Sequence, residues 1–181
     1  MDKLIIPCIY LEQEKAKTGF GSKEDFSQSN PKLLAKTYGN GGADELLVFD
    51  FSMEDADHEK AIAAIKEICM AAEVPVIGAG NIRRMEDVKK LIYAGCAKTV
   101  LNFAKPSNCE LLEEVSKKFG KEKMVIYLPS LEIYKEYSGA IELYGGMLFC
   151  DAGIEEALQA ESSLPVLVLS DEKDACSMLA K

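Results

Sequence analysis

Residues 74–104, VPVIGAGNIRRMEDVKKLIYAGCAKTVLNFA, contain a complete strand–helix–strand pattern, and this pattern decides the fold class. The apolar run Val74–Ile77 predicts a strand, and Val88, Leu91 and Ile92 have the three- and four-residue spacing of a helix. A second β-rich run, Thr99–Asn102, follows. Two strands that are joined through a helix pair in parallel. The stretch therefore predicts one βα unit of a parallel sheet.

Gly78 and Gly80 stand where the first of these strands gives way to the helix. Glycines at such a corner let backbone N–H groups approach an anion, and the positive end of the following helix favours negative charge. The same corner can also be a tight strand-to-helix turn without a ligand. The pattern alone leaves both interpretations open.

The alternation of β-rich runs and helical stretches continues through the 181 residues. Most of the β-rich runs are continuously apolar, which is typical of strands covered by helices in a barrel or a doubly wound sheet. Two similar fragments, residues 41–52 and 94–105, each close a helix and open a strand, and they indicate duplication of a βα unit. The seven strands that we expect are Leu4–Leu11, Glu45–Phe51, Val74–Ile77, Thr99–Asn102, Met124–Leu128, Met147–Cys150 and Pro165–Leu169.

Composition excludes several classes of partner. Thirty acidic residues against 21 basic ones give a net charge of -9, which repels nucleic acid and anionic lipid. We therefore expect no nucleic-acid and no membrane partner. The N-terminal MDKLIIPCIY has too short an apolar run for a signal peptide or a membrane span, and this predicts a cytoplasmic protein.

The residues that most often bind metals are scattered. None of the six cysteines has the paired spacing of a structural zinc site, and several lie in apolar runs, where a reduced thiol packs as a small hydrophobe. The single histidine, His58, lies in the acidic stretch MEDADHEK, and we expect it to be a solvated residue at a helix terminus. We expect neither a metal nor a cofactor.

The segment Glu12–Asn30 has few apolar residues and several lysines, serines and glycines. This composition predicts a mobile loop after the first strand. Such a loop can act as a lid, and surface disorder without a function fits the composition equally well.

Three stretches carry a family resemblance: KLIIPCIYL (residues 3–11), PKLLAKTYGNGGADELLVFDFS (residues 31–52) and residues 74–104. Together they resemble the histidine-biosynthesis (βα)8-barrel enzymes. The nearest of these is the cyclase subunit of imidazole glycerol phosphate synthase, and the related phosphoribosylformimino isomerase comes second. The resemblance extends from Lys3 to about Pro129. It implies an α/β fold, a TIM-type (βα)8-like barrel, with chemistry at the C-terminal ends of the strands.

Length bears on how complete such a barrel is. Barrels of this type have about 200–250 residues, so we expect an incomplete one with about seven parallel strands. We treat residues 1–181 as a single domain, either complete or truncated from a longer multidomain chain. The resemblance offers one such chain, the bifunctional phosphoribosyl-AMP cyclohydrolase/phosphoribosyl-ATP pyrophosphohydrolase, of which this barrel would be the N-terminal domain.

The resemblance also implies two catalytic aspartates, at the ends of the first and fifth barrel strands. Tyr10 and Pro129 stand at these positions here. A tyrosine with an ordinary pKa of about 10 is a poor base at neutral pH, and proline has no ionisable side chain. The remaining catalytic candidates are Asp50 at the end of the second predicted strand, Tyr10 itself, and Glu132.

The family holds a substrate with two phosphates. GAGNIR and NFAK match the first phosphate site, with Arg83 or Lys105 adding charge. At the second site Asp171, Glu172 and Asp174 replace the expected glycines and would repel a phosphate. The phosphate-binding residues that we predict are Gly78, Gly80, Asn81, Asn102 and Phe103.

These substitutions favour a degenerate, non-catalytic domain of a histidine-biosynthesis protein, a pseudoenzyme that binds a small phosphorylated metabolite or acts as a scaffold. The alternative is an active cyclase-like lyase or isomerase-like enzyme whose catalytic groups have moved. A third interpretation is a dimerisation domain, because a missing eighth strand would leave unpaired edges on the first and seventh strands. We therefore expect a homo-oligomer or additional histidine-pathway domains.

Overall fold

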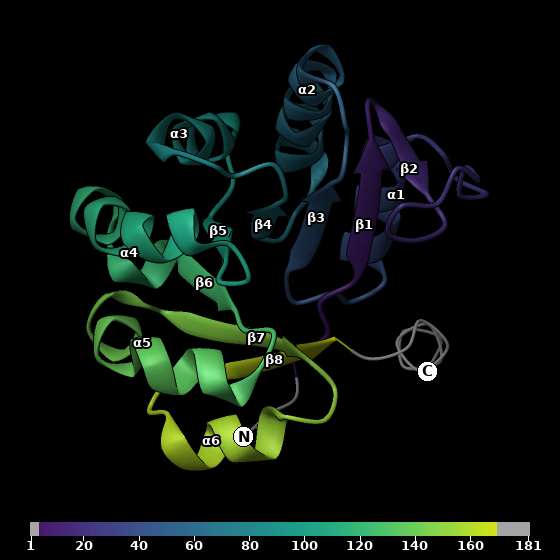
Figure 1. Cartoon of the computed structure of the whole chain (residues 1–181). Helices are drawn as coiled ribbons and strands as arrows, with labels where there is room; N and C mark the ends of the chain where they lie inside the picture. Colours follow the sequence, from purple (N-terminus) through teal and green to yellow (C-terminus); the bar gives the residue numbers. More distant parts are fainter. Residues whose placement is uncertain (1–3, 170–181) are drawn as a thin grey trace. The chain divides into compact units, whose positions relative to one another are not determined.

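A computed structural model describes residues 4–169 (Figure 1). Within this range the chain forms two compact units. Residues 4–81 and 89–97 make up the first unit, and residues 82–88 and 98–169 make up the second. Each unit contains strands followed by helices, in the order that the sequence predicts.

The first unit holds a four-stranded sheet in the order β2–β1–β3–β4. Strands β1 and β3 are parallel, as are β3 and β4, and helices α1 and α2 follow β2 and β3 along the chain. Asn30 begins α1 by accepting hydrogen bonds from the backbone N–H groups of Lys32 and Leu33. The elements are β1 (Cys8–Glu12), β2 (Lys15–Lys17), α1 (Pro31–Asn40), β3 (Leu46–Asp50), α2 (Asp55–Ala71), β4 (Val76–Ala79) and the C-terminal part of α3 (Met85–Ala94).

Strand register decides which side chains share a face of this sheet. Leu11 is paired with Asp50, and Tyr10 is paired with Phe49. Side chains of paired residues lie on the same face, whereas successive residues alternate between faces. Asp50 therefore lies on the opposite face from Tyr10. The Asp50 face carries the helices, because Gly78, the register partner of Val48, packs against α3.

The second unit holds four parallel strands in the order β5–β6–β7–β8, and Figure 1 shows α4, α5 and α6 in succession along one side of them. Ser130 begins α5 by accepting a hydrogen bond from the N–H of Ile133. The elements are β5 (Lys98–Asn102), α4 (Pro106–Phe119), the 3-10 turn η1 (Lys121–Lys123), β6 (Met124–Tyr127), α5 (Leu131–Tyr144), β7 (Met147–Asp151), α6 (Glu155–Glu161) and β8 (Val166–Leu169).

The predicted fold class, an incomplete TIM-type (βα)8-like barrel of the α/β class, is confirmed. All seven predicted strands are present, with boundaries shifted by a few residues, and within each unit they pair in parallel. In residues 4–169 no helix has both the length and the apolar character needed to cross a membrane. The acidic residues Asp171, Glu172 and Asp174 lie outside the described range.

Strand β2 was not predicted, and it corrects the expectation of a loop at Glu12–Asn30. Residues Glu12–Asn30 do not form an unstructured loop, because Lys15–Lys17 pairs antiparallel with β1. Ala16 on β2 also donates its N–H to Ser29 O and accepts from the N–H of Phe26. Strand β2 therefore covers residues 10–12 of β1, whereas β8, the seventh predicted strand, still ends the strand order. The dimerisation interpretation stays a prediction.

Candidate functional site

Asp50, the last residue of β3, is the centre of a polar cluster in the first unit. Its side chain is 1% exposed. Oδ1 accepts a hydrogen bond from the N–H of Ser52 at 2.9 Å, and Oδ2 accepts one from Nδ2 of Asn81 at 2.9 Å. Oδ2 also lies 2.5 Å from Nδ1 of His58. A buried carboxylate needs such donors because burial removes it from water. The cluster therefore joins β3 to the start of α2 and the end of β4.

His58 does not have the solvated position that we expected from its sequence. Its side chain is only 13% exposed, and Nδ1 faces the Asp50 carboxylate. The reason is geometric: α2 begins five residues after Asp50, and its first turn carries His58 back over the end of β3. The imidazole has a second ring nitrogen, Nε2, which also needs a hydrogen-bond partner when it is buried. Within the described residues this Nε2 is buried without a hydrogen-bond partner.

Asn81, which follows β4, supplies a further hydrogen-bond donor to the Asp50 carboxylate. Its backbone has φ of 55°, in the left-handed region that asparagine adopts more readily than most residues. In this conformation, Nδ2 of the Asn81 side chain donates one hydrogen bond to Asp50 Oδ2 and another to Ser52 O, the latter at 3.0 Å. The amide thus ties the end of β4 to the end of β3.

Both glycines of the predicted phosphate corner have structural roles. A Cβ at Gly80, whose φ is 93°, would lie 1.8 Å from the backbone oxygen of Asp50. A Cβ at Gly78 would lie 2.8 Å from Sγ of Cys96 and 3.0 Å from Cδ2 of Leu91. A tight turn at Gly80 and a close contact with Leu91 and Cys96 at Gly78 therefore explain both glycines without a ligand. Anion binding at this corner stays a prediction.

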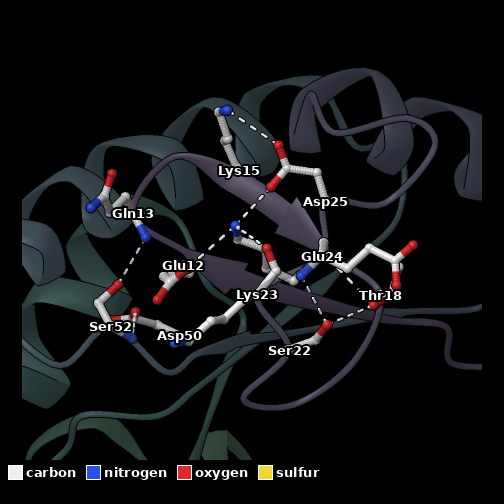
Figure 2. A network of polar contacts seen from close by, with 11 residues as sticks. Glu12, Gln13, Lys15, Thr18, Ser22, Lys23, Glu24, Asp25, Asp50 and Ser52 are labelled. Atoms are coloured by element: carbon white, nitrogen blue, oxygen red, sulfur yellow. Dashed lines mark hydrogen bonds and ion pairs between the residues drawn. The ribbon is translucent and has the colours of Figure 1, made fainter.

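A second polar network covers the ends of β1 and β2 (Figure 2). Nζ of Lys17 lies 2.7 Å from Asp25 Oδ1 and 3.3 Å from Glu12 Oε2, and the Lys17 side chain is 10% exposed. The hydrogen bond to Asp25 raises the pKa of Lys17 from its ordinary value. Nearby, the N–H of Gln13 donates to Ser52 Oγ at 2.9 Å. This bond connects the hairpin to the segment after Asp50, so the segment that we expected to be a mobile loop has defined contacts.

Tyr10 does not join the Asp50 cluster. The two residues lie on opposite faces of the sheet, as the register shows, so they cannot act on one atom as a proton donor and acceptor on the same face. Phe49, the register partner of Tyr10, packs edge-on against Phe20 with ring centroids 5.0 Å apart. The Tyr10 face of the sheet is therefore partly aromatic.

In the second unit, Asn102 and Phe103 precede α4. Oδ1 of Asn102 accepts from the N–H of Ala104 at 2.8 Å, which is a side-chain turn before the helix. The N–H of Phe103 donates to Tyr127 O at 3.0 Å. This donor is therefore already used, contrary to our expectation that it faces an anion.

Glu132 lies exposed in the first turn of α5. A hydrogen bond from its own backbone N–H and one from the Ser130 side chain lower the pKa of its carboxyl from the ordinary value. A carboxylate in this position complements the unpaired N–H groups at a helix N-terminus. The contacts therefore give Glu132 a structural role, and its predicted catalytic role stays untested.

One polar pair was missed from the sequence. The hydroxyl of Tyr127, the last residue of β6, donates to Asp151 Oδ2 at 2.7 Å, and Asp151 ends β7. Burial, followed by this hydrogen bond, raises the pKa of Tyr127 to about 12. Tyr127 is paired in register with Phe149, so Asp151, two residues further on, lies on the same face. A tyrosine and an aspartate at the ends of successive strands are the sequence signal for this pair.

Comparison with known proteins gives a consistent family assignment. The model of a family described as "Histidine biosynthesis protein" matches residues 4–158. The imidazole glycerol phosphate synthase subunit HisF of Campylobacter concisus is 29% identical over 136 residues, which cover 75% of this chain and 54% of that protein. The HisF subunit of Streptococcus sanguinis is 26% identical over 179 residues, covering 96% of this chain and 70% of the relative.

The HisF subunit of Microcystis aeruginosa is 28% identical over 161 residues, covering 88% of this chain and 63% of the relative. In the first of these comparisons the chain spans about half the length of the relative, and in the other two it spans more.

In residues 4–169 no group of three or more His, Cys, Asp or Glu side chains is arranged to hold a metal ion.

Proposed function

Since the chain belongs to the histidine biosynthesis protein family, we propose that it is a non-catalytic barrel domain of a histidine-pathway protein. In this proposal the domain binds a phosphorylated metabolite or acts as a scaffold for other domains, and it does not catalyse the reaction of its HisF relatives. A cytoplasmic location is part of the proposal and comes from the sequence alone.

The orientation of Asp50 is the observation that carries this proposal. Tyr10 and Pro129 stand where the family resemblance implies catalytic aspartates, so Asp50 is the acidic candidate in the first unit. Its carboxylate faces the helix layer, is 1% exposed and is bound to Ser52, His58 and Asn81. A carboxylate in that position cannot exchange a proton with a substrate on the other face. A positioned acid or base contributes about 10²- to 10⁴-fold to a rate, and here two are replaced.

An activity assay tests the non-catalytic part. The protein is incubated with the ribulosyl precursor of imidazole glycerol phosphate and ammonia, and product formation is compared with that of a HisF subunit. We expect a rate at least about 100-fold lower than that of the HisF subunit. Turnover within about tenfold of the HisF subunit, and its loss in an Asp50→Asn variant that still folds, would contradict the proposal.

Anion binding depends on the corner after β4. The backbone N–H groups of Gly80 and Asn81 are the groups that we propose for a phosphate. The N–H groups of Arg83 and Arg84 already donate to Oδ2 of Asp87, at 2.9 and 3.1 Å, so the helix start itself offers fewer free donors. The Asn81 side chain is likewise bound to Asp50.

Amide NMR during a phosphate titration tests this site. We expect shifts confined to residues 78–82, with chloride at equal ionic strength as the control. The Asn81→Gly variant, which tolerates the left-handed backbone, should respond at lower phosphate. No response at millimolar phosphate in either protein would refute the phosphate site and leave the scaffold role.

The second candidate function is an enzyme with relocated catalytic groups, and the Tyr127–Asp151 pair favours it. A phenol that donates to a carboxylate at two strand ends is a proton donor and acceptor at the end of the sheet where barrel enzymes do their chemistry. Under this hypothesis Tyr127→Phe and Asp151→Asn abolish any measured turnover, while circular dichroism shows that both variants still fold. Equal turnover in these variants would exclude the pair.

The partners are proposals as well. The HisF relatives are named as subunits of a synthase. We propose that this chain likewise works beside other histidine-pathway domains, on the same polypeptide or in a homo-oligomer. Light scattering of the purified chain, together with the length of its reading frame, distinguishes these arrangements.

A further inference from the structure

Two cysteines from separate elements of the first unit lie in contact. Cys69 is near the C-terminal end of α2, and Cys96 follows the end of α3 by two residues. Their Sγ atoms are 4.0 Å apart, although 27 positions separate them in sequence. Neither thiol belongs to the Asp50 cluster or to the Tyr127–Asp151 pair.

The surrounding backbone brings these thiols together. Cys96 is 3% exposed, and the absence of a side chain at Gly78 leaves room for its Sγ. Gly95, with φ of 114°, allows the turn after α3 to approach α2, because a Cβ there would lie 2.9 Å from Cβ of Cys69. The N–H of Cys96 donates to Leu91 O at 3.1 Å and holds this turn. The contact is therefore part of the packing of α2 against the turn after α3.

The two thiols have different accessibility. Cys69 is half-buried, whereas Cys96 is buried. The Cys96 thiol as hydrogen-bond donor lowers the pKa of Cys69, and the same contact together with burial raises the pKa of Cys96. Thiolate is the reactive form of cysteine. Cys69 is thus the thiol that reacts first, and Cys96 is in place to react second.

We propose that Cys69 and Cys96 form a thiol modification site that takes a low-molecular-weight disulfide, such as oxidised glutathione, and ends as an intramolecular disulfide. The Cys69 thiolate attacks one sulfur of the reagent, forms a mixed disulfide and releases one thiolate. The Cys96 thiol then loses its proton and attacks Sγ of Cys69, which releases the second thiol of the reagent. Overall, two protein thiols are oxidised, and one disulfide of the reagent is reduced to two thiols.

Formation of the bond brings the sulfurs from 4.0 Å to about 2.05 Å. The cross-link then closes a loop that contains β4 and the corner of Gly78, Gly80 and Asn81. A closed loop restricts the unfolded chain, so the oxidised protein should unfold at higher urea than the reduced one. This inference does not depend on the proposed function, because its test requires neither turnover nor phosphate binding.

The test treats the native chain with oxidised glutathione, blocks free thiols and maps disulfides by peptide mass spectrometry without reduction. We expect a Cys69–Cys96 peptide pair, a loss of two hydrogen atoms in protein mass and reversal by dithiothreitol. Cys109→Ser, which changes another half-buried thiol, should leave the result unchanged. Oxidation in urea, where the contact is absent, should spread among several cysteine pairs.

Two variants separate the two steps. Cys96→Ser should stop the reaction at glutathionylated Cys69, and Cys69→Ser should prevent both products. A mixed disulfide on Cys69 that persists in the unsubstituted chain would overturn the proposal. Preferential oxidation of any other pair in the native protein would overturn it as well.

Discussion

Replacing Asp50 by asparagine tests whether one carboxylate holds together β3, β4 and α2. Asparagine keeps an oxygen that can accept from the Ser52 N–H, but it places an NH₂ group where Oδ2 now faces His58 and Asn81. Two hydrogen bonds to a charged group are lost, each contributing roughly 1.5–3 kcal/mol. We expect the free energy of unfolding to fall by about 3–6 kcal/mol, which is a large effect for one substitution.

The assay is equilibrium urea unfolding at neutral pH, followed by circular dichroism and extrapolated linearly to zero denaturant. Asp55→Asn is the matched control, because it makes the same chemical change at an exposed residue in the first turn of α2. Its effect should stay below about 1 kcal/mol, the range of a helix-terminus charge. A loss of less than about 1 kcal/mol in Asp50→Asn would refute the argument that this carboxylate organises the cluster.

Three further outcomes are expected. Gly80→Ala should lower the free energy of unfolding by more than about 2 kcal/mol, because its Cβ would overlap the backbone oxygen at the end of β3, whereas Gly19→Ala, with open space around it, should not change the urea midpoint. Lys17→Met should speed trypsin cleavage after Lys23, since it removes the cation that binds both Glu12 and Asp25; unchanged cleavage would deny that role. In a pH titration followed by phenolate absorbance, Tyr127→Phe should abolish the ionisation step at about pH 12. Because the folded pKa of that phenol is raised above the ordinary value of about 10, its contribution to stability is complete below pH 10 and is lost as the pH rises through 12.

The seven parallel strands could be predicted because each is a short apolar run separated from the next by a helical stretch. Strand β2 could not be predicted in this way. Lys15–Lys17 has only one apolar residue, and its pairing depends on β1 and on the chain that returns through Asp25 to Ser29. Local composition describes such a segment as a loop, whereas hydrogen bonds to distant residues make it a strand.

The candidate site was likewise predicted only in part from the sequence. The end of β3 and the corner after β4 were located from sequence, since both follow apolar strands. His58 was misjudged because an acidic helix start predicts solvent exposure when the preceding strand is ignored. Its burial depends on how α2 turns back over Asp50, and no local pattern contains that geometry.

The sequence by itself determined the α/β class, the number of parallel strands, the family and the absence of aspartates at positions 10 and 129. These properties depend on local periodicity and on residue identity. The tertiary structure alone decided that Asp50 and Tyr10 lie on opposite faces, that His58 and Asn81 bind the Asp50 carboxylate, and that Cys69 and Cys96 touch. The physical reason is that successive side chains of a strand lie on opposite faces of the sheet, and the register sets which side chains of neighbouring strands lie beside one another. A register shift of one residue would move every side chain of a strand to the other face relative to its neighbours.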